Sequence, residues 1–261
     1  MAISLHEYED GPKYAGDYEA DLAALQTRIA EIQVAHIIHK KRSVVMLEGW
    51  DAAGKGGIIK RMTAMMDPRY YHVWPIFAPT EAERTRHFLW RFWTRLPGDR
   101  EIAVFDRSWY GRVLVERVEG LSPKKDWKRG YDEINQFEAQ QVDSGTAIIK
   151  LFVHITQETQ DEQFAQRLDD PWKRWKTGED DYRNRSNRKA YLEAMDKMFE
   201  KTDTRHAPWI VIDGNHRKSA RIAALTAIAK ALEAHVPMKP PEIDPAVVKL
   251  AEDAFGYTPA D

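Results

Sequence analysis

The stretch Gly49-Trp50-Asp51-Ala52-Ala53-Gly54-Lys55-Gly56-Gly57 decides the fold of this chain. A short apolar run at residues 43–48 precedes it and predicts a strand that is buried on both faces. Apolar residues at helical spacing follow it, from Ile58 to Met66. A strand, a glycine loop with a lysine and then a helix bring helix-initial amides and an ammonium group to one anion. We therefore predict a phosphate-binding loop rather than a glycine turn with a surface lysine.

The predicted loop offers both backbone and side-chain ligands. Lys55 is the loop lysine, while Gly56 stands where phosphate loops usually carry a serine or threonine whose hydroxyl holds Mg²⁺. Asp51 is a hard oxygen ligand, and an unpaired carboxylate there would repel phosphate unless a cation lay between them. We expect Asp51 to bind the metal; a turn-forming aspartate is the alternative. The backbone cradle is predicted to comprise Gly49, Ala52, Ala53, Gly54, Gly56 and Gly57.

Strands and helices alternate along the rest of the chain, without an internal repeat. This alternation predicts an α/β fold with a parallel sheet that helices cover on both faces. A capping box, Thr80 with Glu83, begins the predicted helix that reaches Arg95. The other predicted strands are 72–77, 102–105, 147–155 and 209–212, and the other predicted helices are 17–40, 127–143, 158–168, 188–201 and 219–234.

Composition limits the partners. The 261 residues are 43% hydrophobic, and 39 basic against 41 acidic residues give a net charge of −2, which favours no nucleic-acid partner. The absence of cysteine excludes disulfides and thiolate catalysis and is typical of a reducing compartment. No apolar run approaches the roughly 20 residues of a membrane-spanning helix, and residues 1–10 lack the blocks of a secretion signal. We expect a cytoplasmic protein without a membrane partner.

A second polar cluster, Asp106-Arg107-Ser108-Trp109-Tyr110-Gly111-Arg112, follows the predicted strand 102–105. Open α/β sheets hold their sites at the carboxyl ends of strands, so this cluster should lie beside the glycine loop. Asp106 is then placed to complete the coordination of Mg²⁺, while Arg107 and Arg112 can bind phosphate oxygens. A salt-bridged strand end is the alternative.

The two motifs together resemble the polyphosphate kinase 2 family, whose hallmarks are a Gly-x-Asp-x-Ala-Gly-Lys loop and an Asp-Arg-Ser-Trp-Tyr motif. The resemblance covers about residues 22–234 and implies a P-loop kinase fold with a helical lid. It also implies a Mg²⁺-dependent, reversible phosphoryl transfer between inorganic polyphosphate and nucleotides, with Mn²⁺ as a substitute metal. By motif position, Asp51 and Asp106 resemble the metal-binding acids, Lys55 the loop lysine, Arg107 a phosphate ligand and Arg167 a catalytic arginine beside the lid.

The predicted lid, residues 169–190, is rich in charge and poor in aliphatic residues. For any one of its basic residues, a solvated and salt-bridged position is the simpler interpretation. As a cluster, they would stabilise charge on the transferring phosphates and exclude water. Candidate phosphate ligands are Lys173, Arg174 and Lys176, together with Arg117 from a family-like stretch. Lys60, Arg61, Lys124, Lys125, Lys128 and Arg129 would extend the basic field along a polyphosphate groove.

We expect three parts along the chain: an N-terminal helical segment at 1–42, the kinase domain at 43–235 and a Pro-rich tail at 236–261. Four prolines within residues 237–245 predict an extended conformation for that tail. The family resemblance also favours a homo-oligomer, a dimer or a tetramer.

The expected reaction is an in-line displacement without a covalent enzyme intermediate. ADP and GDP, giving ATP and GTP, are the expected acceptors because the chain has one catalytic unit. The stretch from Trp109 to Leu114 is more similar to AMP-using relatives, so a polyphosphate:AMP phosphotransferase making ADP is an alternative. An ATP-dependent, thymidylate-kinase-like nucleoside monophosphate kinase is another, because such enzymes share an Asp-Arg motif and an arginine-bearing lid. A nucleotide-controlled switch is a different class, although the Asn-Lys-x-Asp motif of one kind of switch is absent.

Overall fold

The computed structural model describes residues 3–258, in which one parallel sheet has the strand order β2-β3-β1-β4-β5. All six residues from Ser43 to Glu48 in the central strand are buried, as a strand covered on both faces requires. The register places Leu47 opposite Asp106 and Gly49 opposite Val153, so the carboxyl ends of three strands meet. The strands are β1 (Arg42–Gly49), β2 (Tyr71–Pro75), β3 (Ile102–Asp106), β4 (Thr146–His154) and β5 (Trp209–Asp213).

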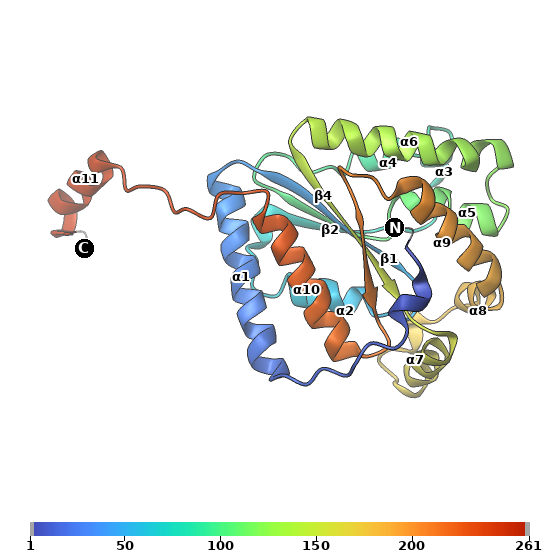
Figure 1. Cartoon of the computed structure of the whole chain (residues 1–261). Coiled ribbons are helices and arrows are strands. Elements are labelled where there is room, and N and C mark those ends of the chain that lie inside the picture. The colour runs from blue at the N-terminus through green and yellow to red at the C-terminus, as the bar shows by residue number, and fades with distance from the viewer. Residues whose placement is uncertain (1–2, 259–261) are drawn as a thin grey trace.

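Helices cover both faces of this sheet (Figure 1). On one face, α1 (Tyr18–Ile38), α2 (Lys55–Met62) and α10 (Arg217–Glu233) pack against one another. On the other face, α6 (Lys124–Asp143) packs on β4 and on α9 (Arg188–Thr202), which contacts α5 (Val115–Val118). Near the carboxyl ends of β1 and β4 lie α7 (Gln157–Asp169) and α8 (Glu179–Ser186). The predicted parallel α/β fold is confirmed.

Residues 80–95 form two short helices where the sequence predicted one. The capping box is present, because Thr80 Oγ1 accepts from the Glu83 amide at 3.3 Å and the Glu83 carboxylate accepts from the Thr80 amide at 2.9 Å. The first helix ends at Arg84, where the Thr85 hydroxyl donates to the Ala82 carbonyl at 3.0 Å. Between the two helices, His87 Nδ1 accepts from the Leu89 amide at 3.3 Å, so local side-chain bonds stand where the helical pattern is interrupted. The two helices are α3 (Glu81–Arg84) and α4 (Trp90–Trp93).

The C-terminal tail contains a helix, α11 (Pro245–Phe255), where the prolines predicted an extended chain. Pro245 occupies the first helical position, and the Asp244 carboxylate accepts from the Ala246 amide at 2.9 Å. A proline at that position starts a helix instead of interrupting one. Figure 1 shows α11 standing away from the sheet at the end of an extended arm.

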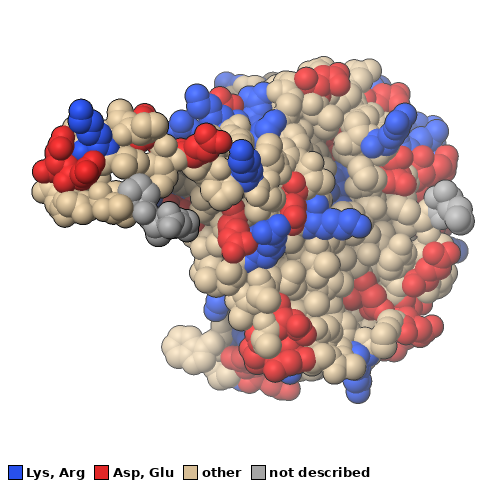
Figure 2. Space-filling model, turned by 60° about the vertical axis from the view of Figure 1, so that its left-hand side comes forward, with Lys and Arg blue, Asp and Glu red and all other residues tan. Residues whose placement is uncertain are grey.

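The surface carries both signs of charge. Figure 2 shows acidic and basic side chains interspersed over one face of the body and over the projecting arm, in keeping with the net charge of −2. Among residues 3–258, the helices are all too short or too polar to cross a membrane.

Candidate active site

The glycine loop connects β1 to α2 with a backbone that only particular residues can adopt. Gly49 has φ of +130°, and a Cβ atom there would overlap the Val153 carbonyl oxygen, so glycine is required. Gly54, with φ of +99°, is the N-cap of α2. Ala52 also has a positive φ, 65°, which is uncommon for a residue with a side chain and is typical of functional loops. The first free amides of α2 therefore point into the loop.

Lys55 is buried at the first position of α2. Its Nζ donates to the carbonyl oxygens of Gly49 and Trp50, each at 2.8 Å. Burial lowers the pKa of Lys55, and the neighbouring Arg107 adds to this effect, while nearby carboxylates oppose it. The ammonium group is thus held at the centre of the loop, and a bound phosphate would replace the carbonyl contacts.

Asp51 is the acid inside the loop, and its carboxylate already has partners. Arg107 forms an ion pair with its Oδ1, and Asn184 of α8 donates to its Oδ2 at 3.0 Å. Burial alone would raise the pKa of Asp51, but Arg107 and then Lys55 hold it below its ordinary value. The carboxyl group is therefore ionised at neutral pH, as it must be to bind a metal.

The residues at the end of β3 and directly after it, Asp106-Arg107-Ser108-Trp109-Tyr110, are called the β3 motif. A buried acid, Glu48, joins this motif to the glycine loop and is the last residue before Gly49. Its Oε1 accepts from both the amide and the hydroxyl of Ser108, each at 2.7 Å. Arg107 directly precedes Ser108 and has a positive φ of 65°, and its amide donates to the Leu47 carbonyl at 3.0 Å. This strained backbone directs Arg107 toward Asp51 across the ends of β1 and β3.

Behind the motif, a fully buried ion pair fixes two aromatic residues. Glu138 of α6 accepts from Trp109 Nε1 at 2.9 Å and from the Tyr110 hydroxyl at 2.8 Å. Lys150 of β4 donates to Glu138 at 2.9 Å and to the Thr202 carbonyl at 2.8 Å. Neither charged side chain is exposed to solvent. Because every member has a hydrogen-bonding partner, the network can hold the β3 motif rigidly.

The predicted lid contains α8, which contacts the glycine loop, α7 and the carboxyl end of α5. Besides the bond from Asn184 to Asp51, Arg183 pairs with Glu119 at 2.6 Å. Arg185 forms two bonds of 2.6 Å with Asp161 of α7. In this structure α8 is therefore docked across the phosphate loop.

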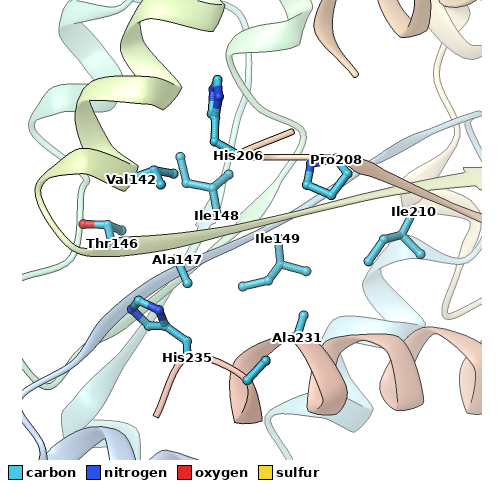
Figure 3. A pocket seen from close by; sticks show the side chains of 11 residues that line it. Val142, Thr146, Ala147, Ile148, Ile149, His206, Pro208, Ile210, Ala231 and His235 are labelled. Carbon is cyan, nitrogen blue, oxygen red and sulfur yellow. The ribbon is translucent and has the colours of Figure 1, made fainter. Parts of the chain in front are cut away.

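A small cavity remains between the loop and the docked α8. Its volume is about 50 Å³, whereas sites for drug-sized ligands have about 300–1,000 Å³. A ligand of that size could enter between the loop and α8 only if α8 moved, as loops that close over substrates do. A larger cavity, about 290 Å³, lies at the amino end of β4, away from the loop (Figure 3). Its lining is apolar apart from a few groups such as His206 and His235, so it does not suit phosphate.

The other predicted phosphate ligands are not all at the loop. Arg167, in the last turn of α7, is close enough to lower the pKa of Asp51. Arg112 instead pairs with Glu116 at 2.9 Å, and Arg117 donates to the Tyr131 hydroxyl at 3.0 Å. Three further candidates, Lys173, Arg174 and Lys176, are exposed on the segment before α8.

Several residues at the site were not predicted from the sequence. Glu48, Asn184 and Gln160, whose amide donates to the Asp51 carbonyl at 3.0 Å, all contact the loop or its partner motif. An acid that ends an otherwise apolar strand was the available signal for Glu48. The two amide side chains lie more than a hundred residues further on, and nothing in their local sequence distinguishes them.

The donor set fits a metal that substrate oxygens help to hold. Within residues 3–258, no group of three or more His, Cys, Asp or Glu side chains could hold an ion alone. Asp51 and Asp106 supply two carboxylates beside the loop lysine, and both interact with Lys55 electrostatically. Mg²⁺ is commonly bound by one or two carboxylates plus substrate phosphates, so this pair fits Mg²⁺. A Cβ atom at Gly56 would meet nothing within 4 Å, so space does not explain the missing hydroxyl.

Three features define a P-loop kinase-like α/β protein. They are a glycine loop between β1 and α2, an Asp-Arg motif at the end of β3, and an α8 that carries arginines and lies across the loop and the motif. The family model described as Polyphosphate kinase 2 (PPK2) matches residues 13–240. The structure of Polyphosphate Kinase 2 from Arthrobacter aurescens TC1 superposes with a TM-score of 0.84 at 34% identity, covering 92% of this chain and 88% of that one. The chain belongs to the polyphosphate kinase 2 family.

Two relatives show what this chain is similar to within the family. Polyphosphate:AMP phosphotransferase of Pseudomonas aeruginosa is 45% identical over 217 residues, which are 83% of this chain and 44% of that protein. ADP-polyphosphate phosphotransferase 2 of Rhizobium meliloti is 38% identical over 214 residues, which are 82% of this chain and 70% of that protein. The chain thus spans about half the length of the first relative and more of the second.

Proposed function

We propose that this protein transfers a phosphoryl group from inorganic polyphosphate to a nucleotide at the glycine loop. The observation that carries the proposal is a basic cluster beside the loop: Arg61, Arg167, Arg217, Lys218 and Arg221. None of the five forms an ion pair with a carboxylate among residues 3–258. Unpaired cations in such number favour a ligand that carries many negative charges.

The basic cluster begins with Arg61 in the last turn of α2, close to Gly57 in the first turn. A Cβ atom at Gly57 would lie 3.7 Å from Arg61 Nη1 and 3.9 Å from Arg221 Nη2. Both guanidinium groups donate to the Tyr18 hydroxyl, at 3.0 and 3.2 Å, which fixes them side by side. Burial, and then the neighbouring Arg221 and Arg167, lower the pKa of Arg217. We therefore propose that the positive charges of Arg61, Arg217 and Arg221 line a path along α2 and α10 that begins at the glycine loop.

The proposed polyphosphate groove includes fewer basic residues than the sequence suggested. Arg61 joins the basic cluster, but Lys124, Lys125, Lys128 and Arg129 lie on α6, which covers the opposite face of the sheet. A single chain of phosphates along α2 would not meet them. We therefore assign the polyphosphate path to the face formed by α2 and α10.

In the proposed reaction, Lys55 and the loop amides bind the terminal phosphate of the chain. The phosphates behind it are bound by the other members of the basic cluster, Arg61, Arg217, Lys218 and Arg221. A phosphate oxygen of the acceptor nucleotide attacks the terminal phosphorus in line, and the bond to the next bridging oxygen breaks. The shortened chain leaves with that electron pair. The attacking oxygen is already anionic at neutral pH, so no side chain has to remove a proton.

Asp51 and Asp106 would hold Mg²⁺, which when bound neutralises charge on the phosphates. For this, Asp51 must first release Asn184 and Arg107. The released Arg107 would then face the transferring group, and Arg167 would approach it from α7. Arginines in these positions stabilise charge that develops during transfer.

The acceptor is proposed from the relatives. We favour AMP, giving ADP, because the Pseudomonas aeruginosa relative named for AMP is 45% identical and the stretch from Trp109 to Leu114 resembles AMP-using members. ADP is the second candidate, because the Rhizobium meliloti relative named for ADP shares more of its length with this chain. The homo-oligomer that the family resemblance implies stays a prediction.

The test is a panel of AMP, ADP, GMP and GDP, each incubated with long-chain polyphosphate and Mg²⁺ and analysed by nucleotide chromatography. Formation of ADP from AMP supports AMP as the acceptor. Formation of ATP from ADP, without formation of ADP from AMP, supports ADP as the acceptor. The same panel with ATP in place of polyphosphate tests the nucleoside monophosphate kinase alternative. Transfer from ATP but not from polyphosphate would refute the proposal.

A further inference from the structure

Trp50, the second residue of the glycine loop, has a buried indole that contacts His154, Arg188 and Tyr191. It is 4% exposed, and its Nε1 donates to His154 Nδ1 at 3.0 Å. The guanidinium carbon of Arg188 lies 4.1 Å from the centre of its ring, a cation–π contact. A side chain so fixed also fixes the backbone of the loop, including the Trp50 carbonyl that accepts from Lys55.

His154 can hold the indole only in one tautomer. The indole N–H is a donor, so His154 Nδ1 must carry the lone pair and Nε2 must carry the proton. That proton points at the carboxylate of Glu9, whose Oε1 lies 3.0 Å from Nε2. His154 is fully buried, and its pKa is lowered by burial, with Glu9 opposing this effect. The neutral ring with its proton on Nε2 is therefore the state that satisfies both partners.

Glu9 belongs to the segment that precedes α1, and this segment is fastened across the carboxyl end of the sheet. Asn215 Nδ2 donates to the Glu9 carbonyl at 3.2 Å, and the Gly11 amide donates to Asp213 at 2.7 Å. These bonds connect the segment to the end of β5. None of them requires the Glu9 carboxylate, which contacts His154 and, through its other oxygen, the exposed His6 at 3.3 Å.

We propose that Glu9, His154 and Trp50 form a positioning network that sets the conformation of the glycine loop from the N-terminal segment. Glu9 selects the tautomer of His154, His154 orients Trp50, and Trp50 holds the loop backbone around Lys55. A second contact route reaches the same loop, because Arg188 donates to Gln160 and Gln160 donates to the Asp51 carbonyl. These residues position the loop and do not touch substrate. The consequence for turnover rests on the proposed function, whereas the effect on the loop does not.

Two variants of His154 separate the bonds. His154→Asn presents a carbonyl oxygen at the place of Nδ1 and can accept from Trp50, whereas His154→Gln presents its amide at the place of Nε2 and can reach only Glu9. Glu9→Ala removes the partner that selects the tautomer, and Glu9→Gln retains an acceptor for Nε2. Glu7→Ala is the matched control, because Glu7 is an exposed acid in the same segment.

The first measurement is amide hydrogen exchange of peptides that span residues 49–57, in the full-length protein without substrate. Loss of one ordinary hydrogen bond predicts about fivefold faster exchange in His154→Gln and Glu9→Ala. His154→Asn, Glu9→Gln and Glu7→Ala should exchange at the rate of the unaltered protein. Equal rates in the two His154 variants would overturn the network, and so would faster exchange that spreads equally to peptides of α6, because that reports only lost stability.

The second measurement is kcat for transfer from polyphosphate. We expect a loss of about fivefold in Glu9→Ala, with little change in KM, and no further loss when Glu9→Ala is added to Trp50→Phe. Additive losses would contradict the network. If the unaltered protein shows no transfer, the proposed function fails, and the exchange measurement still decides the network.

Discussion

The buried pair of Lys150 and Glu138 allows a quantitative test of what holds the β3 motif in place. Both side chains are fully buried, and Lys150 Nζ makes three hydrogen bonds of 2.8–2.9 Å. Lys150→Met removes the cation and leaves the Glu138 carboxylate buried without it. Breaking such a pair from one side costs about 3–5 kcal/mol, a large part of the about 5–15 kcal/mol that stabilises a typical domain.

The double variant Lys150→Met with Glu138→Gln removes both charges. The introduced glutamine amide would still accept from Trp109 or Tyr110, so we expect the double variant to be more stable than Lys150→Met alone. The assay is urea unfolding followed by far-UV circular dichroism, with Lys201→Met as the control for an exposed lysine. A loss below about 1 kcal/mol in Lys150→Met, or a double variant that loses the sum of the two single losses, would show that the buried pair does not hold the motif in place.

Three further predictions follow from individual contacts. Burial lowers the pKa of His36 to about 4 from 6.5, so the unfolded chain binds more protons between these pH values. The free energy of unfolding should therefore decrease as pH falls from 6.5 toward 4, by about 1.4 kcal/mol per pH unit at most, and His36→Gln should lose this dependence in urea titrations. Gly49→Ala should prevent folding or lower the thermal midpoint strongly, because its Cβ would overlap the Val153 carbonyl, whereas Gly56→Ala should fold normally, and equal midpoints would contradict the loop geometry. Arg167→Ala should lower kcat by about 10²-fold with a small change in KM, and an unchanged kcat in steady-state assays would remove Arg167 from the transfer step.

Much of the fold and part of the candidate site could be predicted from the sequence because the signals are local. The run from Ser43 to Glu48, the glycine loop and the start of α2 are contiguous, and their spacing alone predicts a phosphate site. Asp106 could be added because parallel strands end at the same edge of a sheet. Both predictions depend on backbone geometry that short sequences determine.

The rest of the site could not be predicted, because it depends on contacts between distant segments. Asn184 reaches Asp51 across 133 positions, and Glu9 reaches His154 across 145. The interrupted helix at residues 80–95 has a different cause, since the side chains of Thr85 and His87 bond to nearby backbone groups between its two halves. The direction of Arg112 toward Glu116 likewise follows from packing and not from its position in the motif.

Whether transfer occurs at the glycine loop is tested by measuring transfer from polyphosphate to AMP without ATP, in the unaltered protein, in Lys55→Ala and in Lys230→Ala. Lys230 is an exposed lysine on α10 and serves as the control. We predict that the unaltered protein and Lys230→Ala form ADP while polyphosphate is consumed, and that Lys55→Ala loses at least about 10²-fold in rate while remaining folded. ADP formation at a near-normal rate by folded Lys55→Ala would show that transfer does not occur at the glycine loop.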